Sequence, residues 1–102
     1  MKALVEGHLY HLDSFEEDLV KGETLQFIQK EKNEAGELVT VQNGTTNEEV
    51  LAVLIDRMNY LQSKFPCREN AIAITNLEQA LMWLNKRTQD RVNRGVEGKC
   101  EK

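Results

Sequence analysis

Three arginines near the C-terminal end of the chain have a spacing that suits binding of an anion. Arg87, Arg91 and Arg94 lie at i, i+4 and i+7, so a helix places them on one face. The planar guanidinium group pairs with two phosphate oxygens at once, which makes phosphate a well-matched ligand. The same spacing also suits a solvated basic helix end, in which Asp90 pairs with Lys86 or Arg94. The residues alone leave both interpretations open.

Two residue pairs near the middle of the chain could contact a nucleotide. Tyr60 and Asn70 flank a predicted turn, where an aromatic ring can stack on a base and an amide can hydrogen-bond the edge of the base. Arg68 and Thr75 are seven residues apart, on one helix face near an N-terminus whose free N–H groups attract anions. Turn packing and helix capping explain these pairs too, and neither explanation is excluded.

The sequence contains no recognisable catalytic or metal-binding motif. G-x-S-x-G, the Walker loop and G-x-G-x-x-G are all missing. His8 and His11 have no C-x-x-C or H-E-x-x-H near them, so we expect no metal. We expect no structural disulfide between Cys67 and Cys100. The sequence therefore favours a binding protein, with no enzyme activity and no cofactor.

Length and charge narrow the classes of partner. A chain of 102 residues has room for one domain with a thin stability margin, which favours oligomerisation. The pI is about 5.2, and the charge is −5 over residues 1–45 and +1 over residues 46–102. Duplex DNA binding normally requires a broad basic surface, so DNA is a poor partner. No membrane span or signal peptide is evident, and we expect a cytoplasmic protein.

The first 45 residues alternate between apolar and polar positions in short runs. A mixed apolar stretch, Leu4–Leu12, is followed by the polar connector 13–23. Alternation then predicts strands at Thr24–Lys30 and Leu38–Gln42, which the turn-forming run EKNEAG joins into a β-hairpin.

The remaining residues predict two helices. A capping box from Thr46 to Glu49 starts a helix over 47–64, which ends before Pro66. A second helix continues from about residue 67 to about residue 94. The short connection makes the two helices antiparallel neighbours.

The predicted fold is therefore α+β, in a single oligomeric domain spanning residues 1–102. It comprises a β-rich N-terminal part (1–45), a long antiparallel two-helix hairpin (46–95) and a polar tail (96–102). The second helix would extend about 10 residues past the first. On or near that extension lie three apolar side chains that another subunit should cover, Met82, Trp83 and Val92.

Residues 43–99 resemble a known family. The segments TTNEEV, KFPCREN, AIT-x-LE-x-A-x-MWL-x-KRT and RGVEG are similar to the phage anti-Thoeris sponges, and the helix hairpin also resembles the anti-CBASS cyclic-nucleotide sponges. The resemblance implies a phage-encoded protein in the host bacterial cytoplasm. Such a protein binds glycocyclic ADP-ribose made by Thoeris TIR proteins without cleaving it, so that the effector stays inactive. Family members form dimers and hexamers, and some also hold cyclic di- or trinucleotides.

The resemblance also implies site residues. Tyr60 matches an aromatic that stacks on adenine, although the family position is a phenylalanine, and Asn70 matches an amide that contacts base or ribose. Arg87 and Arg91 match the phosphate-binding arginines.

A second, cyclic-trinucleotide site is implied at a three-fold junction, formed by Arg68 and Thr75. The N-terminal part of the main pocket does not transfer by resemblance, and its candidates are Lys30, Lys32 and His11. Two alternatives stay open: a structural phage oligomerisation protein and a small helix-turn-helix regulator.

Overall fold

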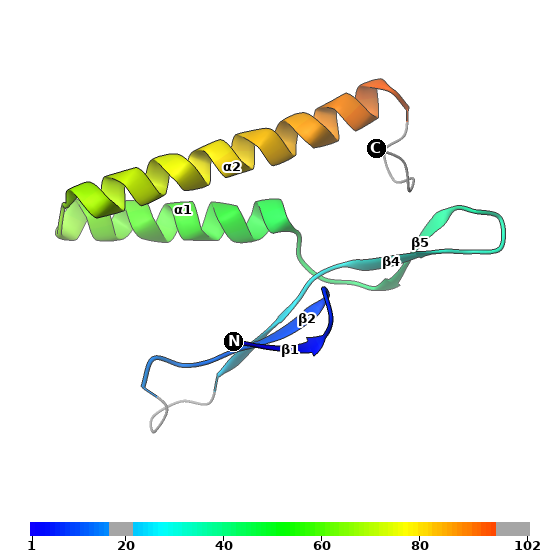
Figure 1. The fold of residues 1–102 in the computed structure, drawn as a ribbon, viewed down its shortest axis with the longest axis horizontal. Helices are drawn as coiled ribbons and strands as arrows, with labels where there is room; N and C mark the ends of the chain where they lie inside the picture. The colour runs from blue at the N-terminus through cyan, green and yellow to red at the C-terminus, as the bar shows by residue number, and fades with distance from the viewer. Residues whose placement is uncertain (17–21, 96–102) are drawn as a thin grey trace. The chain divides into compact units, whose positions relative to one another are not determined.

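The computed structural model describes residues 1–16 and 22–95, which form five β-strands followed by two α-helices (Figure 1). Contacts group the chain into two compact units, one ending at Thr46 and one beginning at Asn47. The α+β class predicted from the sequence is confirmed. The tail 96–102 and part of the connector predicted at 13–23 lie outside the described residues.

A three-stranded antiparallel sheet comes first. Its strands are β1 (Lys2–Val5), β2 (Leu9–Leu12) and β3 (Glu23–Gln26), in the order β1-β2-β3. The stretch predicted at Leu4–Leu12 thus contains a turn as well as strand. The ring of Tyr10 on β2 meets that of Phe27 edge to face, with centroids 5.9 Å apart, so the aromatic contact fixes the end of β3 against β2.

A separate two-stranded hairpin pairs β4 (Gln29–Lys32) with β5 (Leu38–Gln42). The predicted hairpin and its second strand are confirmed, and Glu31 and Lys32 of the predicted turn belong to β4. The side chain of Asn33 shapes the turn, because its Oδ1 accepts hydrogen bonds from the backbone N–H groups of Ala35 and Glu37 at 2.9 and 3.0 Å. Gly36 completes the turn with a φ of 79°.

The strand predicted at Thr24–Lys30 is wrong as a single element, because it divides between the two sheets. The division falls at two consecutive residues whose N–H groups donate in different directions. Phe27 donates to the carbonyl of His8 at 2.7 Å, and Ile28 donates to that of Thr45 at 2.9 Å. The alternation of Leu25 and Phe27 with polar neighbours also stops here, because Ile28 places a second apolar residue directly after Phe27.

The two helices are α1 (Asn47–Lys64) and α2 (Arg68–Asn93), which run side by side and antiparallel (Figure 1). The predicted bounds are confirmed: α1 ends two residues before Pro66. The side chain of Gln62 holds the turn by accepting from the N–H of Cys67 at 3.1 Å and donating to its carbonyl at 3.0 Å. Cys67 then caps α2, accepting from the N–H of Asn70.

The contact between the helices is made by one apolar stripe on each helix. Among the described residues, Ile74 alone falls in the buried class, with 8% of its surface exposed. Its neighbours in the stripe are half-buried, namely Leu51, Ile55, Met58, Leu61, Leu77, Leu81 and Leu84. Two helices alone therefore shield their shared face only in part.

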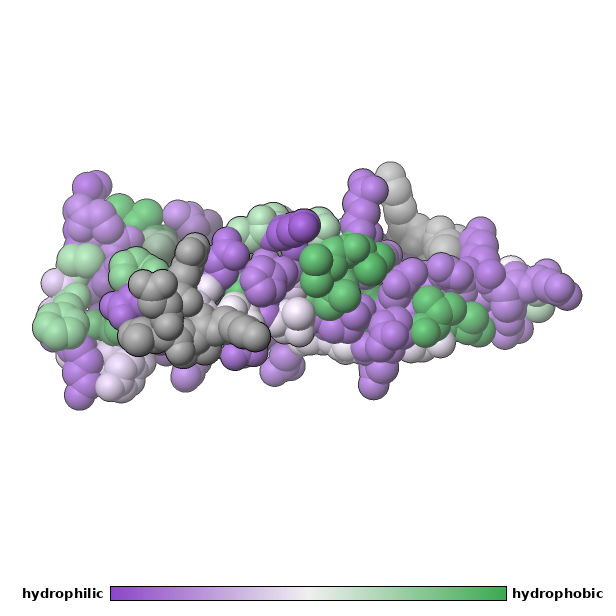
Figure 2. All heavy atoms as spheres, turned by 90° about the horizontal axis from the view of Figure 1, so that it is seen from below, coloured by the Kyte–Doolittle hydropathy of each residue, from purple (hydrophilic) through white to green (hydrophobic). Residues whose placement is uncertain are grey.

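Several large apolar side chains remain exposed. Figure 2 shows hydrophobic residues in green at separate places among hydrophilic ones in purple. On α2 the exposed members include three residues that the sequence predicted to need a partner, Met82, Trp83 and Val92.

These three residues lie at different levels of the hairpin. Met82 lines a groove with Ile55, so it lies alongside α1 instead of past its end. The helices are antiparallel and Ile55 lies beside Met82. Asn47, the first residue of α1, is eight residues before Ile55 and therefore lies near the level of Asp90, eight residues after Met82. Val92 lies on the same face of α2 as Ile74, which is 18 residues, or five turns, earlier. Of Met82, Trp83 and Val92, Val92 is the residue that lies beyond the end of α1.

Candidate functional site

The C-terminal half of α2 carries an open groove of about 360 Å³ that combines an aromatic ring with cations. A volume of this size is at the lower end of those that hold small molecules. Helix periodicity places its lining residues on one face, at i, i+3, i+4, i+7 and i+11. They are Trp83, Lys86, Arg87, Asp90 and Arg94.

The cations of this groove differ in how they are engaged. The ammonium of Lys86 lies 3.2 Å from the carboxylate of Asp90, which is one of the two pairings predicted from the sequence. Arg94 instead donates from Nε to the backbone carbonyl of Asp90 at 3.4 Å. Arg87 makes no hydrogen bond or ion pair within the described part of the chain. Its guanidinium is therefore free to bind an anion.

Arg91 differs from Arg87, although one turn separates them. It does not line the groove, it is half-buried, and it already has an interaction partner of its own. Seven residues separate it from Leu84, so it continues the apolar stripe of α2 beyond the end of α1. The predicted basic face of three arginines thus consists of two groove residues and one half-buried neighbour.

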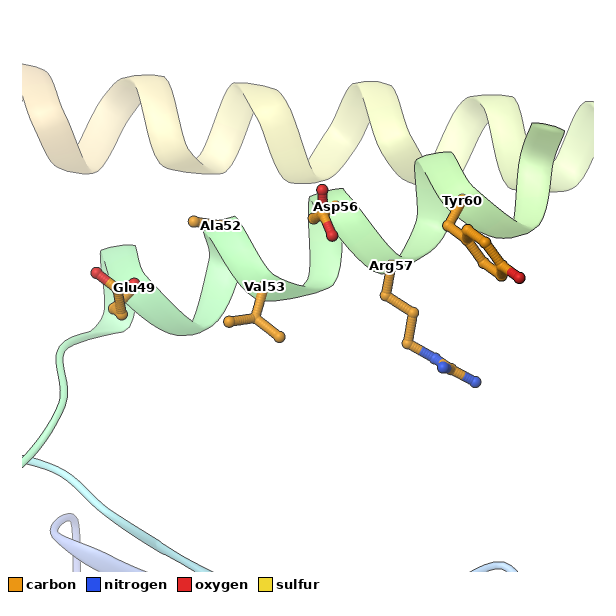
Figure 3. Close-up of a pocket in the computed structure, with 6 residues that line it drawn as sticks. All are labelled: Glu49, Ala52, Val53, Asp56, Arg57 and Tyr60. Atoms are coloured by element: carbon orange, nitrogen blue, oxygen red, sulfur yellow. The ribbon is translucent and has the colours of Figure 1, made fainter.

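Tyr60 lies on the exposed face of α1, with 60% of its surface accessible. Figure 3 shows the side chains of Val53, Arg57 and Tyr60 pointing away from α2. A shallow surface of about 540 Å³ follows this face, lined by Glu49, Ala52, Val53, Asp56, Arg57 and Tyr60. The ammonium of Lys64 lies 5.6 Å from the centre of the Tyr60 ring, within cation–π range.

Asn70 occupies the first turn of α2, where its position is fixed by the cap. Its backbone N–H donates to the Sγ of Cys67, and its side-chain amide makes no hydrogen bond within the described residues. The amide can therefore bond a ligand. Tyr60 and Asn70 both lie at the turn end of the hairpin, as the sequence predicted.

Arg68 and Thr75, the predicted trinucleotide residues, are both exposed on α2. Seven residues of helix separate them by about 10 Å along the axis. Neither side chain makes a hydrogen bond or ion pair within the described residues. One subunit thus presents the guanidinium of Arg68 and the hydroxyl of Thr75 at two levels of α2.

The predicted main-site residues form two groups that are not brought together within one chain. Because Ile55 and Met82 share a groove, Tyr60 lies near the level of Leu77. Arg87 is about 15 Å further along the axis than Tyr60, and about 26 Å further than Asn70. Within one chain, Tyr60 and Arg87 therefore line two different surfaces and not one pocket.

The N-terminal candidates lie in the β-rich unit. His11 is on β2, with its Nε2 3.7 Å from Asp13, and Lys30 and Lys32 are exposed on β4. The N-terminal ammonium, 3.1 Å away, holds the pKa of Asp13 below its usual value, and His11 adds to this. Residues 1–16 and 22–95 contain no group of side chains arranged to bind a metal. The same described residues contain no helix that is long and apolar enough to cross a membrane.

Sequence reasoning missed two contributors to these surfaces. Trp83 was interpreted as a packing residue, although its i, i+4 spacing from Arg87 predicts a shared surface. Arg57 was not considered, although it precedes Tyr60 by three residues and lines the same face. Helical spacing counted from Arg87 would have indicated Trp83, and spacing counted from Tyr60 would have indicated Arg57.

The sequence that forms the last strands and the helix hairpin matches the model of a known protein family. The Acb2/Tad1 hairpin domain family matches residues 24–89, and the chain belongs to this family. The match begins in β3, earlier than the segment in which sequence inspection found the resemblance. It includes Tyr60, Asn70 and Arg87, and it ends two residues before Arg91.

A curated relative is similar over much of the chain. The protein named Thoeris anti-defense 1, from Bacillus phage SBSphiJ7, is 53% identical over 83 residues. The aligned region covers 70% of this chain and 58% of the relative. The chain therefore spans less than two thirds of the protein that it resembles.

Proposed function

We propose that this chain is a phage anti-Thoeris protein that sequesters a cyclic ADP-ribose signal without cleaving it. Membership of the Acb2/Tad1 hairpin family, together with 53% identity to a Thoeris anti-defense protein, is the observation that carries the proposal. The ligand has an aromatic base and a pyrophosphate. The exposed aromatic rings and the unpaired guanidinium of Arg87 suit these two parts.

The binding site in this proposal is shared between two copies of the chain. Tyr60 and Asn70 of one copy hold the base and ribose, and Arg87 and Arg91 of the other hold the phosphates. The distance of about 26 Å between Asn70 and Arg87 along one helix supports this division. A second copy running antiparallel would bring the turn end of one hairpin to the arginine end of the other.

The strength required of such a protein is within reach of these contacts. Nanomolar capture corresponds to about −12 kcal/mol. Stacking contributes about 1–3 kcal/mol per base, and each charge-assisted hydrogen bond about 1.5–3 kcal/mol. Binding without cleavage is supported by the anti-defense name of the relative and by the family match.

The decisive experiment is capture and release. The protein is incubated with purified glycocyclic ADP-ribose, separated from unbound ligand and then heat-denatured, and the released material is identified by mass spectrometry. Intact ligand in stoichiometric amount supports sequestration. A converted product would reveal an enzyme, and no released ligand would overturn the proposal.

The first prediction from this proposal concerns assembly. Because the hairpin leaves Val92 exposed beyond α1 and buries little of its own face, we expect a dimer at least, assembled further into a hexamer. Light scattering at micromolar concentration should show no species at the 11.7 kDa of one chain. A stable monomer of that mass would contradict the shared site.

A second prediction concerns Arg68 and Thr75, which we propose bind a cyclic trinucleotide at a junction of three copies. Their exposure on α2, at levels different from that of Arg87, supports a separate site. Arg68→Ala should abolish trinucleotide binding and leave cyclic ADP-ribose affinity within a factor of about two, as calorimetry measures. Loss of both activities, with the oligomer intact, would mean that the two sites are not distinct.

A further inference from the structure

Trp83 exposes a large apolar indole ring to solvent. Its side chain is 61% accessible, and it lines the α2 groove one turn before Arg87. Tryptophan is among the side chains whose burial contributes most to binding, and an indole face left in water forgoes that contribution. Something in the assembled protein should therefore cover it.

The position of Trp83 on the helix argues against a partner subunit as the cover. Successive residues advance by about 100° around a helix, so Val92 lies on the opposite side from Trp83, and Met82 about 100° away. A subunit packed over Val92 would leave Trp83 facing elsewhere. Both apolar residues can be covered by protein while the indole stays accessible to a ligand.

The charges around Trp83 point in the same direction. The groove holds three cations and one carboxylate, which leaves a net positive charge beside the ring. The centres of protein interfaces are normally depleted of charged residues. An aromatic face flanked by guanidinium groups instead fits a molecule that is itself both aromatic and anionic, which is the description of a nucleotide.

We propose that Trp83 stacks on the base of the nucleotide whose phosphate Arg87 binds. This inference rests on the proposed function and extends it, since it assigns a second aromatic contact from the arginine-bearing subunit. The base then lies between Trp83 of one copy and Tyr60 of the other. The site should therefore select a nucleotide over pyrophosphate or inorganic phosphate. Those anions can pair with Arg87, but they have no base to stack on Trp83.

Intrinsic fluorescence tests the contact directly, because Trp83 is the single tryptophan of the sequence. Titration with cyclic ADP-ribose should quench the emission and reduce quenching by acrylamide, with a midpoint that matches calorimetry. Pyrophosphate at the same concentrations should leave the emission unchanged. Emission that ignores cyclic ADP-ribose while calorimetry records binding would overturn the contact.

Substitution separates stacking from packing. Trp83→Leu keeps apolar bulk for a protein partner and removes the stacking face, so affinity should fall about 5- to 150-fold. Trp83→Phe should retain most of the affinity. Gln89→Ala is the control, an exposed residue on another face of the same helix, and it should bind as the unmodified protein does.

The outcomes distinguish this inference from the function on which it rests. If the unmodified protein binds no cyclic ADP-ribose by calorimetry, both fail. If it binds, and Trp83→Leu binds equally well, the stacking contact alone is wrong. If Trp83→Leu loses binding only because the oligomer dissociates in light scattering, Trp83 is a subunit contact and the inference is overturned.

Discussion

Arg87→Ala should weaken binding of a cyclic ADP-ribose ligand by about 1.5–3 kcal/mol, or about 10- to 150-fold. The side chain has no partner among the described residues, so its removal disturbs no contact within the subunit. The loss should therefore appear in affinity and not in thermal stability. Arg87→Lys should recover only part of the affinity, because lysine keeps the charge without the planar fork.

The matched control for Arg87→Ala is Gln89→Ala. Gln89 is exposed on the same two turns of α2, contributes no charge, and donates from its side-chain amide to the Oδ1 of Asn93 at 2.9 Å. Calorimetry of both variants, after light scattering has shown an unchanged oligomer, should separate a specific phosphate contact from a general effect on the helix. Full affinity in Arg87→Ala would remove the α2 groove from the site.

Arg91→Ala is a less direct test of the same surface. Arg91 is half-buried and already engaged, so the variant loses an intramolecular contact as well as any phosphate contact. We expect it to lower both the unfolding temperature and the affinity. Comparing the two variants shows how much of the Arg91 effect comes from the fold.

The helices were predictable from the sequence because their signals are local. The capping box at Thr46, the restriction before Pro66 and the long apolar period each act within a turn or two. The strands were less predictable. Alternation marks a strand but not its partner, so the passage of the chain from β3 to β4 at Phe27 needed the observed hydrogen bonds.

The candidate site was predictable as a set of residues and less so as an arrangement. Spacing placed the arginines on one helix face, and the structure gives them unequal surroundings, since Arg87 is free and Arg91 is half-buried. Burial depends on where α1 stops beside α2, which is a property of two elements together. The sequence placed Met82 on or near the extension of α2, and the structure places it beside Ile55 of α1, exposed as predicted.

Mixing two weakened variants should restore tight binding at some of the sites. Tyr60→Ala and Arg87→Ala each damage every site in their own oligomers, but they damage different halves of it. In a mixed dimer, one site combines both defects and the other combines the intact Tyr60 with the intact Arg87. This result is expected only if the two residues of a site come from different chains, as their separation along the hairpin of about 15 Å suggests.

The magnitude of the recovery can be stated. With random assembly about half of the dimers are mixed, and half of their sites are intact, so about a quarter of all sites should regain full affinity. The measurement is the stoichiometry of tight binding by calorimetry, after the two variants have been unfolded together and refolded. Each variant refolded alone is the control and should show no tight phase.

A site formed within one chain predicts a different fraction of tight sites in the mixture. If Tyr60 and Arg87 of the same chain formed one site, every site in the mixture would carry one defect, and no tight phase would appear. Mixed oligomers must be present for that result to count, so one variant carries a mass label and native mass spectrometry verifies the exchange. Exchange without recovery would exclude the shared site, whereas a tight phase near one site in four would establish that each ligand is held by two chains.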